Sequence, residues 1–148
     1  MLKRKTGELK LTRPLSIRVI HWLLATTVIL TYFVFYDGDW IHRYLGYASL
    51  AALILRAAYS IFTKKRLVPL SDHPILAKIT YIFIWLFVFL VGLTGSMMTF
   101  DRFWGEEWVE NLHLRLSQAL ILLVAFHLTG VILDAYSKKR PTWMFIIR

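Results

Sequence analysis

Long runs of apolar residues dominate the chain, and short polar stretches separate them. Four runs are long enough to predict helices, at about residues 17–36, 41–62, 79–100 and 112–136. A helix needs roughly 20 mostly apolar residues to cross the hydrocarbon core of a membrane, and backbone hydrogen bonding in lipid favours helices for such runs. The pattern therefore predicts an all-α membrane protein, an up-down bundle of four transmembrane helices in one domain over residues 1–148.

The amino-acid composition agrees with a membrane location and restricts which metal sites and cofactors the chain can hold. Of the 148 residues, 57% are hydrophobic and 18% are charged, which is too apolar for a soluble domain of this size. The first run is longer than the apolar core of a signal peptide and no small-residue cleavage site follows it, so we expect a retained helix. The chain has no cysteine, which excludes disulfides, thiolate-bound zinc, iron–sulfur clusters and covalently attached c-type haem.

The net charge of +9 follows a pattern along the chain. The N-terminal tail through Arg18, the connection at 64–78 and the tail from Lys138 onward hold 14 of the 18 lysines and arginines. The other two connections hold six acidic residues, namely Asp37, Asp39, Asp101, Glu106, Glu107 and Glu110. The positive-inside rule then predicts that both termini are cytoplasmic. The excess of lysine and arginine is explained by the orientation of the helices in the membrane, so we expect no nucleic-acid partner.

Four histidines lie within or at the ends of the predicted helices. An ionisable group inside a bilayer is costly and is a functional candidate by default. His113 and His127 are fourteen residues apart, so they share one helix face about 21 Å apart in depth. His42 matches the outer level and His21 the inner level, which predicts an outer pair, His42 with His113, and an inner pair, His21 with His127. His73 has no partner in depth, and we expect it to be a loop residue.

Paired histidines on facing helices form the ligand set of bis-histidine b-type haem. Such ligands need small neighbours so that the macrocycle can approach the backbone, and each has one: Ala25, Gly46, Ser117 and Gly130. Arg56 lies fourteen residues after His42, hence on the same face at the inner level, where a propionate of the inner haem is a natural partner. Arg43 and Arg115 stand beside the outer pair but off the ligand face, and carry less weight.

Three other interpretations stay open at this point. Histidines inside a membrane often serve as hydrogen-bond donors between helices. Zinc or copper would need a third and fourth ligand at each level, and the sequence supplies none. A haem-free scaffold or small transporter would leave the depth-matched histidines unexplained.

The ordered set of these motifs resembles the prokaryotic cytochrome b561 family over about residues 11–148. The architecture is also similar to the cytochrome b subunits of membrane hydrogenases and formate dehydrogenases. The residues that carry the resemblance are IHW at 20–22, H-x-x-x-G at His42–Gly46, Arg56, H-x13-H at 113–127 and KKRPTWMF at 138–145.

The resemblance implies that His21, His42, His113 and His127 are the axial ligands of two haems b in the bacterial inner (cytoplasmic) membrane. It also implies electron transfer between membrane quinone and a periplasmic partner, a c-type cytochrome or a redox subunit. Two alternatives are a membrane anchor subunit of a periplasmic dehydrogenase or hydrogenase and a superoxide:quinone oxidoreductase. The six outer acidic residues would repel superoxide. Whether the chain is an enzyme by itself, and whether it forms a homo-oligomer, stays open.

Overall fold

The computed structural model describes residues 15–34, 39–63 and 75–137, and this part of the chain is helical without any strand. The elements in chain order are α1 (Leu15–Phe33), α2 (Trp40–Phe62), α3 (Ile75–Met97), the short 3-10 turn η1 (Asp101–Phe103) and α4 (Glu107–Ser137). Each helix coincides with one of the four predicted runs. The all-α prediction is confirmed.

The helix boundaries differ from the predicted ones mainly at α3 and α4. α3 begins at Ile75, four residues early, and α4 begins at Glu107, five residues early. The apolar pattern missed the first turn of α4 because that turn contains Glu107 and Glu110. Acidic side chains are nevertheless favourable there, since the N-terminus of a helix carries a partial positive charge.

The connection between α3 and α4 is a compact turn of short hydrogen bonds. The amide of Phe100 donates to the Met97 carbonyl at 3.0 Å, and the amide of Phe103 donates to the Phe100 carbonyl at 2.9 Å. Gly105 follows with φ of 74°, a left-handed conformation that glycine adopts without steric cost. These contacts end α3 at Met97, three residues before its predicted end, and reverse the chain into α4.

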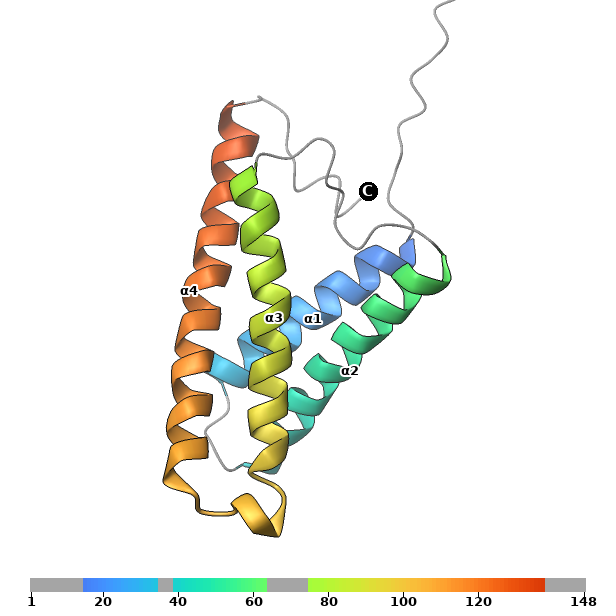
Figure 1. Cartoon of the computed structure of the whole chain (residues 1–148). Helices are drawn as coiled ribbons and strands as arrows, with labels where there is room; N and C mark the ends of the chain where they lie inside the picture. The colour runs from blue at the N-terminus through green and yellow to red at the C-terminus, as the bar shows by residue number, and fades with distance from the viewer. Residues whose placement is uncertain (1–14, 35–38, 64–74, 138–148) are drawn as a thin grey trace, which may run out of the picture.

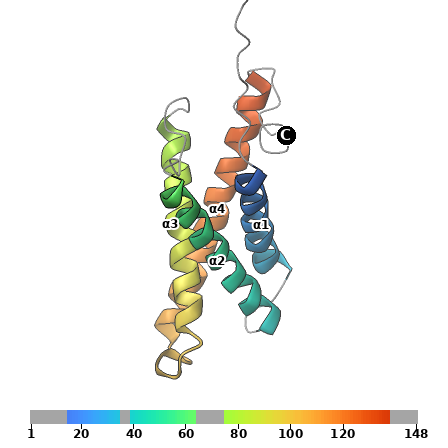
Figure 2. The ribbon, with the colours of Figure 1, turned by 90° about the vertical axis from the view of Figure 1, so that its right-hand side faces the viewer.

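The four helices alternate in direction, and consecutive helices pack against each other: α1 on α2, α2 on α3 and α3 on α4. α1 and α2 are inclined to the α3–α4 pair (Figure 1). α3 and α4 lie closest near η1 and diverge toward the other end of the molecule (Figure 2). In contrast to the consecutive helices, α1 and α4 do not pack along each other.

Side-chain burial is small and unlike that of a water-soluble bundle. In the described part of the chain the buried hydrophobic residues are Ala52, Leu53, Val88, Val109 and Leu120, whereas large apolar side chains on every helix are exposed. Small and polar residues at helix contacts, with large apolar residues facing outward, are typical of membrane proteins. α2, α3 and α4 are long and apolar enough to cross a membrane, whereas the apolar segment of α1, Arg18–Phe33, is shorter. Three of the four predicted spans are thus supported, and a bundle that encloses two haems stays a prediction.

A buried pair of hydroxyl groups joins α1 to α2. Ser49 Oγ donates to Thr27 Oγ1 at 2.9 Å, and Thr27 donates in turn to the Leu23 carbonyl at 2.9 Å. Both residues are buried, at 7% and 5% exposure. Because each hydroxyl proton has an acceptor, the contact places two polar groups inside the bundle without an unsatisfied donor.

Several predictions concern residues outside the described ranges. Among them are the N-terminal basic residues before Leu15, the connection 64–74 with His73, Asp37, and the C-terminal tail from Lys138. The predicted orientation, with both termini in the cytoplasm, therefore stays a prediction.

Candidate functional site

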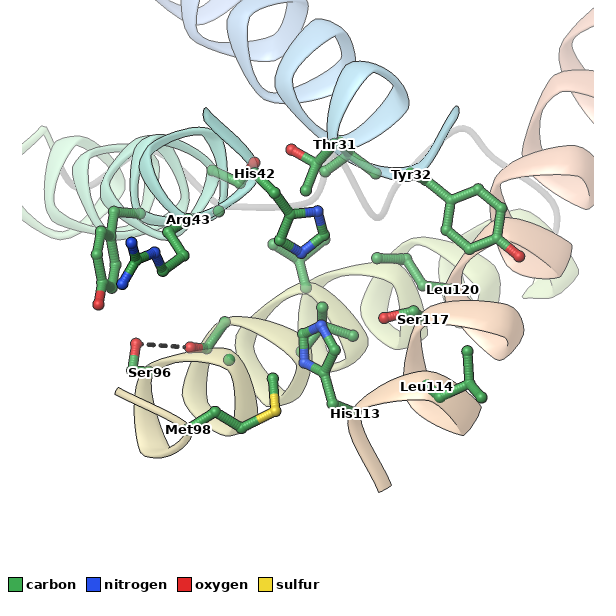
Figure 3. A pocket seen from close by; sticks show the side chains of 18 of the residues that line it. Thr31, Tyr32, His42, Arg43, Ser96, Met98, His113, Leu114, Ser117 and Leu120 are labelled. Carbon is green, nitrogen blue, oxygen red and sulfur yellow. Dashed lines mark hydrogen bonds between the residues drawn. The ribbon is translucent and has the colours of Figure 1, made fainter. Parts of the chain in front are cut away.

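The structure brings His42 and His113 together. His42 lies in the first turn of α2, and His113 lies in the second turn of α4. Their ring centroids are 6.3 Å apart, and the ring planes are inclined by 70°. Figure 3 shows the two imidazoles pointing toward each other, one from each helix. The two residues of the predicted outer pair thus face each other at one level, although they are 71 positions apart in the chain.

A cavity of about 940 Å³ surrounds the two rings. This volume lies near the upper end of the roughly 300–1,000 Å³ of small-molecule and cofactor pockets. Residues from all four helices line the cavity, and several are small: Gly46, Gly92, Gly95 and Ser117. A Cβ atom added at Gly46 would meet no atom within 4 Å, so the helix backbone itself borders open space beside His42.

Polar groups complete the cavity wall. Tyr47 Oη donates to Thr99 Oγ1 at 3.1 Å and links α2 to the turn that follows α3. Arg43 and Glu110 also line the cavity, whereas Arg115 does not. In Figure 3 the Arg43 side chain extends to one side of His42. The structure therefore distinguishes the two arginines that the sequence left equal, and only Arg43 is placed to meet a ligand in this cavity.

Two residues of α3 that the sequence analysis missed contact the His113 ring. Thr94 Oγ1 lies 3.0 Å from His113 Nδ1, and a Cβ added at Gly95 would lie 3.1 Å from His113 Cε1. The signal in the sequence was the run Gly-Leu-Thr-Gly-Ser at 92–96, which is small and polar in a helix otherwise rich in large apolar residues. Such runs mark close helix approach in membranes, but they do not say which residue approaches.

The predicted inner pair is arranged differently. His21 and His127 are both half-buried, but the helices that carry them, α1 and α4, do not pack along each other. The His21 ring makes an edge contact with Trp22 on its own helix at 5.9 Å. Arg56 is buried within α2, at 6% exposure. The structure thus places Arg56 inside the bundle as expected but does not bring His21 and His127 into ring contact.

The chemistry of the outer pair is that of a two-histidine site. Within the described ranges, no group of three or more histidine, aspartate and glutamate side chains is arranged to hold a metal ion. A zinc or copper ion bound by protein alone takes three or four such ligands. Two opposed imidazoles instead suit an iron whose remaining ligands come from a porphyrin.

Comparison of the chain with known proteins agrees with this chemistry. Neither the search of curated proteins nor the search of solved structures gave a match. The family model for prokaryotic cytochrome b561 matches residues 12–148, which is almost the whole chain. The chain therefore belongs to the prokaryotic cytochrome b561 family, and its membership implies a membrane protein that uses haem b in electron transfer.

Proposed function

We propose that this protein is an integral membrane cytochrome with two haems b that transfers electrons between membrane quinone and a periplasmic redox partner. The observation that carries the proposal is the pair of opposed rings, His42 and His113, in a cavity of ligand size between the helices. His42 and His113 are the proposed axial ligands of the outer haem, and His21 and His127 are those of the inner haem.

The geometry of the outer pair fits this role. Metal–imidazole bonds are about 2.0–2.1 Å long. Two such bonds, together with the half-widths of two imidazole rings, add up to a separation close to the observed 6.3 Å between centroids. Gly46 lies one helical turn after His42 and borders open space, as a flat macrocycle beside that ligand requires. The ring separation and the open space beside Gly46 therefore support His42 and His113 as ligands of one iron.

The chemistry that the site supports is outer-sphere electron transfer. Haem b supplies a one-electron iron couple, and two histidine ligands leave no open position for oxygen or a substrate. The chain's part is to hold and orient the ligands and to surround them with apolar side chains such as Val88, Val91 and Leu120, which line the cavity. An apolar surround limits access of water and so affects the reduction potential.

The proposal of an inner site rests on the spacing of the two histidines in α4 and on the burial of Arg56 in α2. α4 is continuous from Glu107 to Ser137, so His113 and His127 lie on one helix about 21 Å apart. Arg56 is buried and lies fourteen residues after His42 within α2. A buried guanidinium needs polar or anionic partners inside a membrane, and a haem propionate has the charge and the planar geometry to be one of them.

The outer surface favours a cationic partner over an anionic one. Asp101, Glu106, Glu107 and Glu110 are exposed at the η1 end of α4, next to the cavity. Such a field attracts a lysine-rimmed c-type cytochrome and repels superoxide. Electron transfer to such a cytochrome should slow as salt is raised, and Glu107→Lys should slow it at low salt. A rate that depends on neither salt nor Glu107 would contradict this choice of partner.

The test of the proposed function is a reduced-minus-oxidised spectrum of the purified protein, with haem quantified per chain. We expect a b-type spectrum and about two haems per chain. His113→Ala and His127→Ala should each lose one haem, and the two lost haems should differ in reduction potential. His73→Ala is the matched control and should keep both. A colourless protein, or one whose haem content is the same in all three variants, would refute the ligand assignment.

A membrane anchor subunit is the second candidate. The observation that favours it is the connection between α3 and α4, which consists of little more than the η1 turn and adds no catalytic domain of its own. This candidate keeps the same haem ligands and predicts that a stoichiometric redox subunit copurifies from the native membrane. A free-standing cytochrome predicts that the chain purifies alone and still reduces or oxidises quinone.

A further inference from the structure

The hydroxyl of Thr94 faces His113 from the neighbouring helix. Thr94 is buried, at 4% exposure, and its Oγ1 lies 3.0 Å from His113 Nδ1. The same oxygen lies 2.9 Å from the Leu90 carbonyl and 3.1 Å from the Val91 carbonyl. Carbonyl oxygens only accept hydrogen bonds, so the single hydroxyl proton of Thr94 is directed to the backbone of α3.

This arrangement assigns the proton of His113. With the Thr94 proton bonded to the backbone, Oγ1 can accept a hydrogen bond from the imidazole, and this arrangement puts the imidazole N–H on Nδ1. A neutral imidazole has one donor and one acceptor nitrogen. The tautomer with the proton on Nδ1 leaves the lone pair of His113 on Nε2. In this tautomer Nε2 is therefore the nitrogen whose lone pair could bind a metal.

Gly95 sets the distance of the ring from α3. An added Cβ at this position would lie 3.1 Å from His113 Cε1, which is tighter than most real Cβ contacts, and 3.6 Å from Nδ1, which is an ordinary van der Waals distance. A larger residue at this position would push the imidazole away from the α3 backbone by a few tenths of an ångström. Thr94 holds one edge of the ring through Nδ1, and Gly95 admits the adjacent Cε1 edge.

We propose that Thr94 and Gly95 form a seat for His113, which fixes the Nδ1–H tautomer, orients the ring and lowers the reduction potential of the iron that His113 binds. This inference rests on the proposed function, since it requires His113 to be an axial ligand. Thr94 and Gly95 are positioning residues that act through His113. The physical reason for the lower potential is that an Nδ1–H hydrogen bond makes the ligand more basic, and a more basic ligand favours ferric over ferrous iron.

The test is a redox titration of the full-length protein carrying Thr94→Val, which keeps the side-chain shape and removes the acceptor. We expect the reduction equilibrium of one haem to move about three- to tenfold toward the ferrous form, where tenfold corresponds to about 59 mV for one electron. Thr94→Ser keeps the hydroxyl and should titrate like the wild type. Thr80→Val is the matched control for the haem that His113→Ala removes, because Thr80 also donates to a carbonyl four residues earlier in α3, at 2.9 Å, but lies fourteen residues from Thr94; it should leave the potential of that haem unchanged.

A second readout concerns ring orientation. Gly95→Ala should rotate or displace the His113 ring, and the low-temperature electron paramagnetic resonance of the ferric bis-histidine haem should change its g values. Thr80→Val should leave that spectrum unchanged. An unchanged spectrum in Gly95→Ala would contradict the seat.

The outcomes separate the seat from the function on which it rests. If His113→Ala keeps all its haem, the ligand assignment fails and the seat fails with it. If His113→Ala loses one haem while Thr94→Val titrates like the wild type, the function stands and the seat is overturned. If Thr94→Val loses the haem, Thr94→Ser decides: retention of the haem supports the role of the hydroxyl, and loss refutes it.

Discussion

Gly46 offers a substitution whose effects on folding and on haem binding should have opposite signs. Its position in α2 is helical, and an added Cβ would meet no atom within 4 Å. Glycine in a helix interior is less stable than alanine by roughly 0.5–1 kcal/mol. Gly46→Ala should therefore stabilise the haem-free protein by about this amount, since the methyl group clashes with nothing.

The haem-loaded protein should respond in the other direction. If the macrocycle lies against Gly46, the added methyl overpacks the site, which typically costs about 1–3 kcal/mol. That cost corresponds to a loss of affinity of roughly five- to 150-fold. Gly46→Leu extends four carbons into the cavity of about 940 Å³ and should abolish the outer haem, leaving about one haem per chain.

The assay is a haemin titration of detergent-solubilised apoprotein followed in the Soret band, with thermal unfolding of the apoprotein measured by circular dichroism. Gly130→Ala is the control, because Gly130 is also a helical glycine with no atom within 4 Å of an added Cβ but does not line the cavity. It should raise the melting temperature and leave the outer-haem affinity unchanged. A Gly46→Leu protein with two haems and wild-type affinity would refute the placement of haem beside Gly46.

Three further predictions test other parts of the structure. The chain has no cysteine, so a single introduced cysteine can report on which side of the membrane it lies. Asp101→Cys should be labelled in intact cells by a maleimide that cannot cross the inner membrane, and Ser137→Cys should be labelled only after permeabilisation. The reverse pattern of labelling would contradict the predicted topology. Ser49→Ala removes the hydrogen bond to Thr27 and should lower the free energy of unfolding in detergent by about 0.6 kcal/mol, and by at most about 1.7 kcal/mol. An unchanged free energy of unfolding would mean that the hydroxyl pair does not stabilise the α1–α2 contact. Arg56→Gln should lower one haem potential by on the order of tens of millivolts, since a nearby positive charge favours the ferrous form, and potentials that match the wild type would place the inner propionates elsewhere.

The helices and the meeting of His42 with His113 were predictable from the sequence for a physical reason, whereas the ligand roles of the four histidines stay a prediction. In a membrane each backbone group must be satisfied within its own segment, so a long apolar run determines a helix almost by itself. The interval between His113 and His127 then determines their depth and their common face, because helix geometry is regular. Gly46 and Arg56 follow by the same reasoning, and the structure places Gly46 on the cavity wall and Arg56 in the interior.

The ends of the helices were harder to predict, because a hydropathy pattern does not recognise charged residues that stabilise the first turn of a helix. The first turn of α4, with Glu107 and Glu110, is polar yet helical. The structure describes α1 as Leu15–Phe33, with an apolar segment Arg18–Phe33 that is shorter than the other three spans, and the predicted end at residue 36 lies outside the described residues. A pattern of apolar residues reports contact with lipid, and it says little about a turn that lies at the surface of the membrane.

Contacts between helices were decided by the tertiary structure alone. Neither the 3.0 Å contact between Thr94 Oγ1 and His113 Nδ1 nor the close approach of that ring to Gly95 can be read from the sequence, because both depend on the rotation of α3 relative to α4. The same holds for the choice of Arg43 over Arg115 at the cavity. The sequence determined which residues lie at one depth, since depth follows from counting residues along one helix. Which of them touch depends on how two helices turn toward each other, and only their packing settles that.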